Sequence, residues 1–295
     1  MVTGAASGIG CTLATALAQL GAAVAVADVD IASAQRVADN LNHIGYSAIA
    51  VAMDVTCEHS VTNAFATVDK QLGLVDILIS NAGIQWIAPL DQLAFEDWQR
   101  VLAVHLDGAF LTARAALQRM YQTISIINQY SKAPLNIFSS QTHLSVQAET
   151  NQANLQPNHQ PNQPKLARGG AIIFIGSVHS HLASALKAPY VTAKHGLLGL
   201  SRTLAKEGAS RGVYSYVVCP GYVKTPLVDQ QIPAQARLLN ISEQEVISQV
   251  MLKDTVDGEF TSYDDLARTV CFLASFPNAA LTGQSITVSH GWSMH

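Results

Sequence analysis

The sequence has few charged residues, few aromatic side chains and few cysteines for its 295 residues. Charged residues make up 13% of the chain and the formal net charge is −4, which argues against intrinsic disorder and against an electrostatic nucleic-acid binder. No run of about 18 apolar residues is present, so we expect no membrane-spanning helix. The four cysteines lie far apart, without a CxxC pair or a neighbouring histidine pattern, and this predicts no metal site.

The N-terminal residues lack the basic and apolar stretches of a secretory signal, so the cytoplasm is the expected compartment. Apolar residues make up 49% of the chain, which is enough to bury a large core. The length allows one large domain or two small ones, and the alternation of strands and helices described next predicts a single domain over residues 1–295.

Short β-branched runs alternate with longer segments that carry apolar residues at helical spacing. The expected strands cover residues 22–28, 47–55, 75–83, 170–177, 214–221 and 285–291. Their nearly continuous hydrophobicity suits parallel strands that are buried on both faces. The alternation predicts an α/β fold with a single Rossmann-like, doubly wound parallel sheet flanked by helices. Ligands of such sheets bind beyond the carboxyl ends of the strands.

The first strand is predicted to be truncated, because only Met1 and Val2 precede Thr3-Gly4. Strands usually have about 5–6 residues. We hypothesise that the sequence begins at an internal methionine, or that part of this strand has been lost.

A long segment between two expected elements departs from the strand–helix alternation. Residues 123–167 are rich in Asn, Gln, Ser and Pro, and we expect a low-order surface insertion between a helix ending near Met120 and the strand at Ala171. It should lie at the amino ends of the strands, away from the active site. Contact with a partner is an open alternative for this segment.

Residues 225–260 exceed the length that a simple connection between a strand and a helix needs. They predict two short helices, the second starting at a capping box formed by Ser242 and Glu245. Such a segment either closes over the substrate as a lid or packs statically against the core.

The stretch TGAASGIG, from Thr3 to Gly10, predicts a glycine-rich turn that opens a helix and binds a phosphate through backbone N–H groups. Its GxxxGxG spacing differs from the general GxGxxG fingerprint, so an ordinary turn fits the stretch as well. Asp28 ends the next strand, where a carboxylate accepts hydrogen bonds from adenosine ribose hydroxyls and repels a 2′-phosphate. This favours NAD over NADP. A helix N-cap or a solvated loop carboxylate is the alternative for Asp28.

Tyr190 and Lys194 stand four residues apart in a strongly helical segment and therefore share one helix face. An ammonium group near a phenol favours the phenolate and lowers its pKa from about 10. Ser177 ends a predicted strand 13 residues before Tyr190, so the three side chains are candidates for one catalytic group. The YxxxK spacing alone also fits an amphipathic helix with a surface lysine.

The chain resembles the short-chain dehydrogenase/reductase family in motifs whose order and spacing match along nearly its whole length. These motifs are TGAASGIG, Asp54-Val55, Asn81-Ala82-Gly83, the Ser177/Tyr190/Lys194 set and Pro220-Gly221. The resemblance implies that Tyr190 is the acid/base, that Ser177 fixes the reacting oxygen, and that Lys194 binds the nicotinamide ribose and lowers the pKa of the tyrosine. It also implies an NAD site made of Gly4, Ser7, Gly8, Ile9, Gly10, Asp28, Asp54, Val55, Asn81, Gly83, Tyr190, Lys194, Pro220, Val223 and Thr225.

Residues 176–200, 219–233, 251–262 and 280–292 further resemble bacterial D-3-hydroxybutyrate dehydrogenases. In that group a small hydroxy acid is held by its carboxylate, and the matching donors here are Gln85, His179, Lys187 and Gln231. The resemblance implies reversible oxidation of (R)-3-hydroxybutyrate to acetoacetate with NAD. Another alcohol, a sterol or a 3-hydroxyacyl thioester is the alternative substrate. A catalytically silent NAD-sensing module is the alternative outside enzymes.

His105 is a departure from the family pattern, which usually has Asn at this position. That Asn is associated with a water-linked proton relay to the lysine. His105 either retains the relay or satisfies a buried backbone group, and the sequence leaves both open. The resemblance also implies a homotetramer, in which the helix over residues 95–120 and the helix carrying Tyr190 pair with their counterparts.

Overall fold

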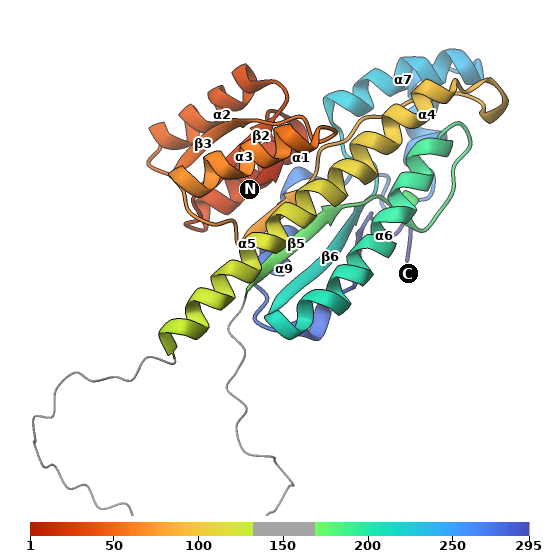
Figure 1. Cartoon of the computed structure of the whole chain (residues 1–295). Helices are drawn as coiled ribbons and strands as arrows, with labels where there is room; N and C mark the ends of the chain where they lie inside the picture. The colour runs from red at the N-terminus through yellow and green to blue at the C-terminus, as the bar shows by residue number, and fades with distance from the viewer. Residues whose placement is uncertain (132–168, 295) are drawn as a thin grey trace, which may run out of the picture.

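A parallel sheet of seven strands forms the centre of the computed structural model, which describes residues 1–131 and 169–294 (Figure 1). The strand order is β3-β2-β1-β4-β5-β6-β7, and every neighbouring pair is parallel. The strands are β1 (Val2–Thr3), β2 (Val24–Asp28), β3 (Ala48–Ala52), β4 (Ile77–Ser80), β5 (Gly170–Ile175), β6 (Val213–Pro220) and β7 (Ser285–Val288). The predicted Rossmann-like, doubly wound sheet is confirmed.

The helices follow the strands in the alternation that the sequence predicts. They are α1 (Gly8–Gln19), α2 (Ile31–His43), α3 (Glu58–Gln71), α4 (Phe95–Leu102), α5 (Gly108–Ser131), α6 (Ala188–Gly208), α7 (Pro226–Leu239), α8 (Glu243–Glu245) and α9 (Tyr263–Ser275). A π-helical turn over Ala103–Asp107 joins α4 to α5, and a second one over Val246–Met251 follows α8.

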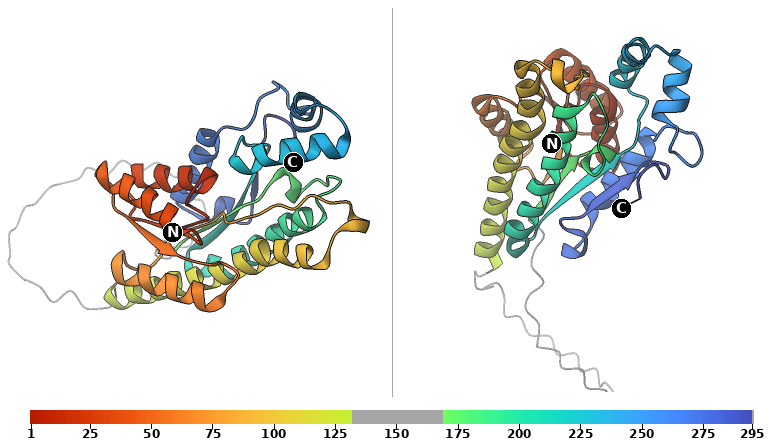
Figure 2. Two further views of the ribbon diagram at one scale, coloured as in Figure 1. Left: turned by 90° about the horizontal axis from the view of Figure 1, so that it is seen from above. Right: turned by 90° about the vertical axis from the view of Figure 1, so that its right-hand side faces the viewer.

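Two hydrophobic cores cover the two faces of the sheet, because alternate strand residues point to opposite sides. Ala25 and Ala27 of β2 belong to the core shared with α3, α5 and α6. Val24 and Val26 of the same strand belong to the core shared with α1, α2 and α9. Figure 2 shows the sheet between these helical layers. Burial on both faces explains the nearly continuous hydrophobic runs of the strands.

Strand β1 consists of two residues and lies in the middle of the sheet. Val2 pairs with Val26 on one side and with Ile79 on the other. The hydroxyl of Thr3 accepts hydrogen bonds from the backbone N–H groups of residues 81 and 82, both at 3.0 Å. These bonds join the exit of β1 to the exit of β4, where the strand order reverses.

Helix α5 is longer than the sequence predicts and extends into the expected insertion. It continues to Ser131, so the expected helix end near Met120 is wrong. Met120 is 0% and Ile124 is 6% exposed, and their spacing of four residues continues one buried helix face behind polar neighbours. The part of the predicted 123–167 insertion from residue 132 onward lies outside the described residues.

The segment after β6 forms a small unit with its own apolar cluster. Helix α8 starts at the predicted capping box: the Glu245 carboxylate accepts from Ser242 N at 2.8 Å, and Ser242 Oγ accepts from Glu245 N at 3.2 Å. The cluster is separate from the two sheet cores and contains Val228, Ile232, Ala236, Val246 and Met251. These side chains join α7 to the π-helical turn.

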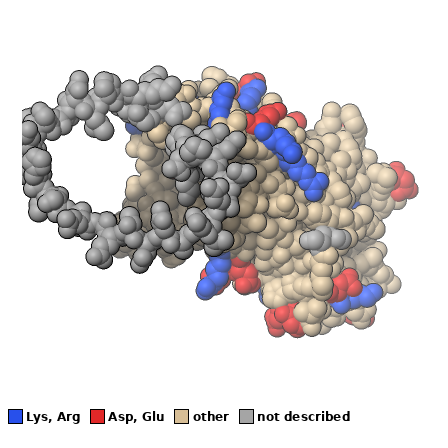
Figure 3. Space-filling view, turned by 90° about the horizontal axis from the view of Figure 1, so that it is seen from below, with Lys and Arg blue, Asp and Glu red and all other residues tan. Residues whose placement is uncertain are grey.

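Charged side chains are scattered over the surface without a single-sign patch on the face that Figure 3 shows. Within residues 1–131 and 169–294, no helix combines the length and the apolar character that crossing a membrane requires.

Candidate active site

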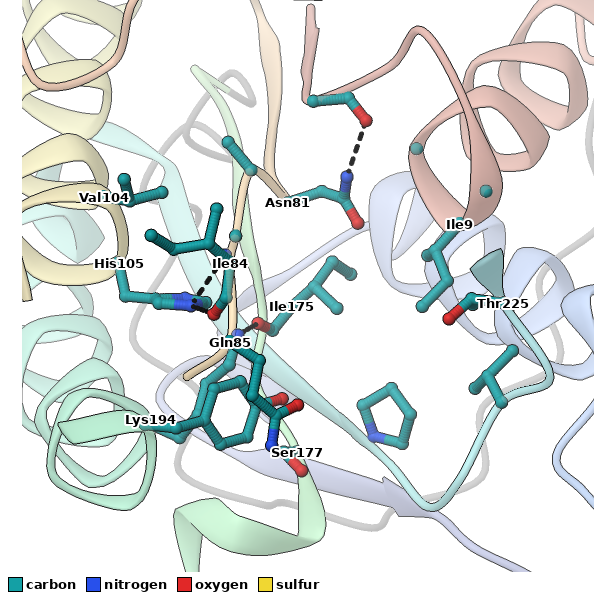
Figure 4. A pocket seen from close by; sticks show the side chains of 18 of the residues that line it. Ile9, Asn81, Ile84, Gln85, Val104, His105, Ile175, Ser177, Lys194 and Thr225 are labelled. Carbon is teal, nitrogen blue, oxygen red and sulfur yellow. Dashed lines mark hydrogen bonds between the residues drawn. The ribbon is translucent and has the colours of Figure 1, made fainter. Parts of the chain in front are cut away.

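All residues predicted for the catalytic, cofactor and substrate sites line one cavity of about 450 Å³. Segments that follow the carboxyl ends of all seven strands form it, together with α6 and α7. It lies where the strand order reverses between β1 and β4, which is the usual ligand position in such sheets. Figure 4 shows side chains that line the cavity.

The glycine-rich loop fits the close approach of a phosphate group. Gly4 and Gly8 have φ of +61° and +54°, a backbone conformation that L side chains rarely adopt. A Cβ on Gly10 would lie 2.2 Å from the carbonyl oxygen of Gly4, so no larger residue fits there. Ser7, the N-cap of α1, makes no side-chain capping bond, and the first N–H groups of the helix are therefore suited to bind an anion.

Asn81 contributes to this loop through its side chain. Its Nδ2 donates to the carbonyl oxygen of Thr3 at 2.9 Å and also to that of Gly4 at 3.1 Å. Figure 4 shows one hydrogen bond from this side chain. Asn81 therefore fixes the turn after β1 as well as lining the cavity.

Asp28 lies at the end of β2, where its carboxylate accepts from the backbone N–H of Ala6 at 2.9 Å and of Asp30 at 3.0 Å. The N-cap of α2 is Asp30, which accepts from Ser33 N. The alternative that Asp28 caps this helix is therefore wrong. A glycine loop at a helix start with a carboxylate beside it fits the adenosine and pyrophosphate of a dinucleotide.

Ser177, Tyr190 and Lys194 converge at the other end of the cavity, as predicted. Lys194 is 4% exposed, and its Nζ donates to the carbonyl oxygen of Ile175 at 2.6 Å. The same Nζ lies 5.4 Å from the centre of the Tyr190 ring. The phenol is hydrogen-bonded to Ser177, which lowers its pKa.

The expectation that Lys194 lowers the pKa of Tyr190 stays a prediction, because burial dominates the pKa of both groups. Burial raises the pKa of Tyr190 to about 12, against the hydrogen bond from Ser177. Burial also lowers the pKa of Lys194 to about 8. Removing both groups from water disfavours both charged forms, and the Lys194 ammonium is directed at the Ile175 carbonyl.

His105 satisfies a buried backbone group, which was one of its two alternatives. Its Nε2 lies 3.1 Å from the N and 2.7 Å from the O of Ile84 (Figure 4). The side chain is 4% exposed, and burial lowers its pKa to about 3, so the imidazole is neutral. The relay role stays a prediction.

Lys187 places a positive charge in the cavity lining, in the same cavity as the catalytic group. It is 5% exposed, and its Nζ donates to the hydroxyl of Tyr222 at 2.9 Å. The Tyr222 ring stacks on Trp292 with a centroid distance of 4.9 Å and an interplanar angle of 7°. Burial lowers the pKa of Lys187 to about 8, and no carboxylate among the described residues pairs with it.

Gln85 and Gln231 meet although they are 146 residues apart, with Gln231 Nε2 donating to Gln85 Oε1 at 2.6 Å. The other two amide atoms, Gln85 Nε2 and Gln231 Oε1, are buried without a hydrogen-bond partner among the described residues. A ligand with both acceptor and donor groups would satisfy them.

Tyr222 and Trp292 line the cavity but were not predicted as site residues. The signal was present, since each aromatic residue follows a glycine just beyond the carboxyl end of an expected strand. Their stacking joins segments 70 residues apart in the chain, which spacing alone does not reveal.

The doubly wound sheet, the dinucleotide loop and the Ser/Tyr/Lys group define an oxidoreductase that acts on alcohols. The chain belongs to the short-chain dehydrogenase family, whose profile, described as short chain dehydrogenase, matches residues 1–144. A related profile, described as enoyl-(acyl carrier protein) reductase, matches residues 155–293. Members of this family use a nicotinamide cofactor, NAD or NADP.

Relatives and solved structures cover nearly the whole chain. The D-beta-hydroxybutyrate dehydrogenase of Rhizobium meliloti is 32% identical, covering 99% of this chain and 97% of its own length. The 3-oxoacyl-[acyl-carrier-protein] reductase of Escherichia coli is 28% identical, covering 100% and 96%. Sorbitol-6-phosphate 2-dehydrogenase of Erwinia amylovora has a similar structure, with a TM-score of 0.80, 28% identity and coverage of 100% and 99%.

Proposed function

We propose that the protein oxidises (R)-3-hydroxybutyrate reversibly to acetoacetate with NAD. The observation that carries the proposal is Lys187, a buried ammonium that faces the cavity without a carboxylate partner among the described residues. A buried cation calls for an anionic ligand. The orphan Gln85 Nε2 adds a second donor in the same cavity.

NAD is proposed over NADP because of Asp28. Its carboxylate lines the cavity at the end of β2 and would repel a 2′-phosphate. Gly4, Ser7, Gly8, Ile9 and Gly10 would hold the pyrophosphate end. Asp54, Val55, Asn81, Gly83, Pro220, Val223 and Thr225 line the rest of the cavity and would hold adenine, ribose and nicotinamide.

The catalytic group would remove a proton from the substrate alcohol. Tyr190, as phenolate, takes the proton of the C3 hydroxyl, and Ser177 donates a hydrogen bond to the same oxygen. The C3–O bond becomes a carbonyl as the C3 hydrogen leaves with its electron pair. Bound NAD would supply the acceptor for that hydride. Lys194 would hold the nicotinamide ribose, and its positive charge would favour the phenolate.

The carboxylate of the substrate would bind beside the Lys187 ammonium and the Tyr222 hydroxyl. Lys187 provides charge, while the Tyr222 hydroxyl, which accepts from Lys187, retains its own hydrogen to donate. Gln231 of α7 would contribute to substrate binding from the segment 225–260, which we propose to be a lid. Trp292 forms an apolar wall against the short carbon chain. His179 lies in the same cavity, where its ring nitrogens contact two serines.

A substitution of Lys187 tests the proposal. We expect Lys187→Met to raise KM for (R)-3-hydroxybutyrate by about 10- to 100-fold, since a charge-assisted hydrogen bond is worth roughly 1.5–3 kcal/mol. The measurement is NADH formation at saturating NAD, with lactate and the S enantiomer as comparison substrates.

Lys224→Met is the matched control, because Lys224 is exposed and lies outside the cavity lining. Equal kinetics of the two variants would contradict carboxylate recognition. Turnover of a 3-hydroxyacyl thioester in preference to the free acid would favour the thioester alternative. The similarity to the 3-oxoacyl-[acyl-carrier-protein] reductase of Escherichia coli supports this alternative. Absence of any NADH formation would favour a silent NAD-binding module.

We further propose that the protein works in the cytoplasm, in ketone body metabolism, as a homotetramer. The similarity to a D-beta-hydroxybutyrate dehydrogenase over 99% of the chain supports the substrate on which the proposed pathway depends. The assembly is proposed from the family resemblance alone.

A further inference from the structure

A turn over residues 289–293 follows β7 and carries Trp292 to the cavity. Trp292 lines the cavity, and its ring stacks on Tyr222 at a centroid distance of 4.9 Å. The two residues before it, His290 and Gly291, have φ of +51° and +76°. Glycine adopts this left-handed conformation freely, whereas a residue with a Cβ keeps it only where its surroundings hold it. The contacts of His290 therefore decide where Trp292 lies.

The segment 225–260 supplies contacts that hold His290. Its Nδ1 lies 2.6 Å from a carboxylate oxygen of Asp257, and its carbonyl oxygen accepts from the backbone N–H of Val256 at 2.8 Å. This side-chain hydrogen bond lowers the pKa of Asp257 below its ordinary value. The ionised carboxylate only accepts, so the hydrogen is on His290 Nδ1. Val256 also contacts the turn, since a Cβ on Gly291 would lie 2.6 Å from Val256 Cγ1.

Asp257 is oriented by hydrogen bonds within its own loop. Its second carboxylate oxygen accepts from the backbone N–H of Glu259 at 3.1 Å. The backbone N–H of Gly258 donates to Thr255 Oγ1, also at 3.1 Å. Because these bonds fix the loop and the carboxylate, the contact with His290 orders less side-chain freedom than an isolated surface pair would.

A second carboxylate lies on the other side of the same imidazole. Asp265 Oδ2 is 3.9 Å from His290 Nε2. Asp265 belongs to the capping box at the start of α9, where its Oδ2 accepts from Ser262 N at 3.1 Å. Helix α9 packs in one of the two sheet cores. His290 therefore lies between a carboxylate anchored to the sheet and a carboxylate of the segment 225–260.

We propose that Asp257 and His290 are positioning residues that set how far Trp292 extends into the cavity, and that they thereby limit the carbon-chain length of the substrate. The inference rests on the proposed oxidation of a short hydroxy acid and deepens it. Trp292 contacts the rings of Tyr222 and His179, so a shift of its indole changes the space available to a ligand. Neither Asp257 nor His290 lines the cavity, so both act through Trp292.

Substitution of Asp257 tests the proposal without altering the cavity lining. In Asp257→Ala we expect KM for (R)-3-hydroxybutyrate to rise about 2- to 5-fold, the range that the loss of one exposed ion pair produces, with kcat changed less than about twofold. The ratio of kcat/KM for the five-carbon to the four-carbon 3-hydroxy acid should rise at least about twofold, because a displaced indole leaves more room. Asp257→Asn keeps an acceptor oxygen for His290 Nδ1 and should restore both values.

Asp254→Ala is the matched control, since Asp254 is an exposed acid three residues earlier in the same segment, and it should leave KM and the chain-length ratio unchanged. His290→Gly removes the imidazole from the other side of the contact and relieves the left-handed backbone. The double variant with Asp257→Ala should cost no more than the larger single change, because both substitutions remove one contact. Additive costs would contradict the proposed pair, and so would an equal loss in Asp257→Asn.

Acrylamide quenching of Trp292 fluorescence measures the position of the indole without substrate. A Trp86→Phe/Trp98→Phe background leaves Trp292 as the single tryptophan. We expect the quenching constant to rise about twofold in Asp257→Ala and to stay unchanged in Asp254→Ala. An unchanged constant in Asp257→Ala overturns the inference, as does an unaltered KM and chain-length ratio in an active enzyme. A raised constant without turnover of hydroxybutyrate would support the positioning role and contradict the proposed substrate.

Discussion

Burial controls the charge state of the ionisable side chains around the cavity. It lowers the pKa of His105 and of His179 to about 3, so both imidazoles are neutral at physiological pH. It lowers the pKa of Lys187 and of Lys194 only to about 8. The cavity therefore combines neutral hydrogen-bonding rings with ammonium groups that await an anion or a ribose.

Tyr190 makes the activity depend on pH. The pKa of Tyr190 is raised to about 12 by burial, so in the free protein its phenolate fraction grows about tenfold for each pH unit below that value. We expect the oxidation rate to rise with pH. We expect Tyr190→Phe to lower it about 10²- to 10⁴-fold and to remove the pH dependence. Initial rates at saturating NAD between pH 6 and pH 10 measure both, and NADH binding monitored by fluorescence serves as control.

Retention of most turnover in Tyr190→Phe would contradict the acid/base role. A rate that falls with rising pH in the unsubstituted protein would contradict the phenolate as the reactive form.

Motif spacing located the site residues but not their electrostatics. Tyr190 and Lys194 are placed on one helix face by their spacing alone, and the cavity contains both. The direction of the Tyr190 pKa shift depends on how much protein surrounds the phenol, which only the packed fold provides. Tyr222 and Trp292 were missed for the same reason, since their stacking is a tertiary contact.

The elements that carry the site differ in how they are anchored. The loops after β1, β4 and β5 leave buried strands, whereas α7 belongs to the separate apolar cluster over residues 228–251. A unit with its own small core can move as a body while the sheet stays intact. This arrangement supports the lid alternative for residues 225–260.

A substitution that leaves a void in the apolar cluster should destabilise the segment 225–260 and leave the stability of the sheet unchanged. Met251 is 1% exposed, and Met251→Ala removes about 2–5 kcal/mol of packing free energy from the cluster. We expect KM for hydroxybutyrate to rise several-fold and proteolysis to begin within residues 225–260, with the main thermal transition little changed. Limited proteolysis followed by mass spectrometry measures the first site of cleavage.

Met120→Ala is the matched control, because Met120 is 0% exposed and belongs to a sheet core. It should lower the melting temperature of the whole protein. A similar drop in melting temperature for Met251→Ala would mean that the segment is a static part of the fold.

Strands were easier to predict than helix ends. Runs such as residues 24–27 are apolar on both faces, so their pattern is unambiguous. The end of α5 was predicted eleven residues early, at Met120 instead of Ser131, because polar residues on its exposed side hide the buried position at Ile124. Composition gives the average polarity of a segment, and this average does not reveal that one face of a mostly polar helix is buried.

At the scale of the whole molecule, the family resemblance implies assembly through α5 and α6. Phe110 of α5 is 47% exposed, a large apolar side chain on the surface of the described chain. We expect a homotetramer in sedimentation velocity experiments, and we expect Phe110→Arg to shift it toward smaller species. A charged residue on a buried apolar interface costs several kcal/mol.

Leu20→Arg is the matched control, because Leu20 is 67% exposed at the end of α1. It should leave the sedimentation coefficient unchanged. A monomer for the unsubstituted protein would contradict the expected assembly.

The amide pair of Gln85 and Gln231 has a consequence for chain length. The two side chains meet at 2.6 Å, one from the loop after β4 and the other from α7. We expect a four-carbon acid to bind without breaking this hydrogen bond. The long arm of an acyl thioester threaded between the two residues would break it and leave two more amide atoms unsatisfied. The Gln85–Gln231 hydrogen bond would thus lower the affinity for long acyl thioesters relative to short free acids.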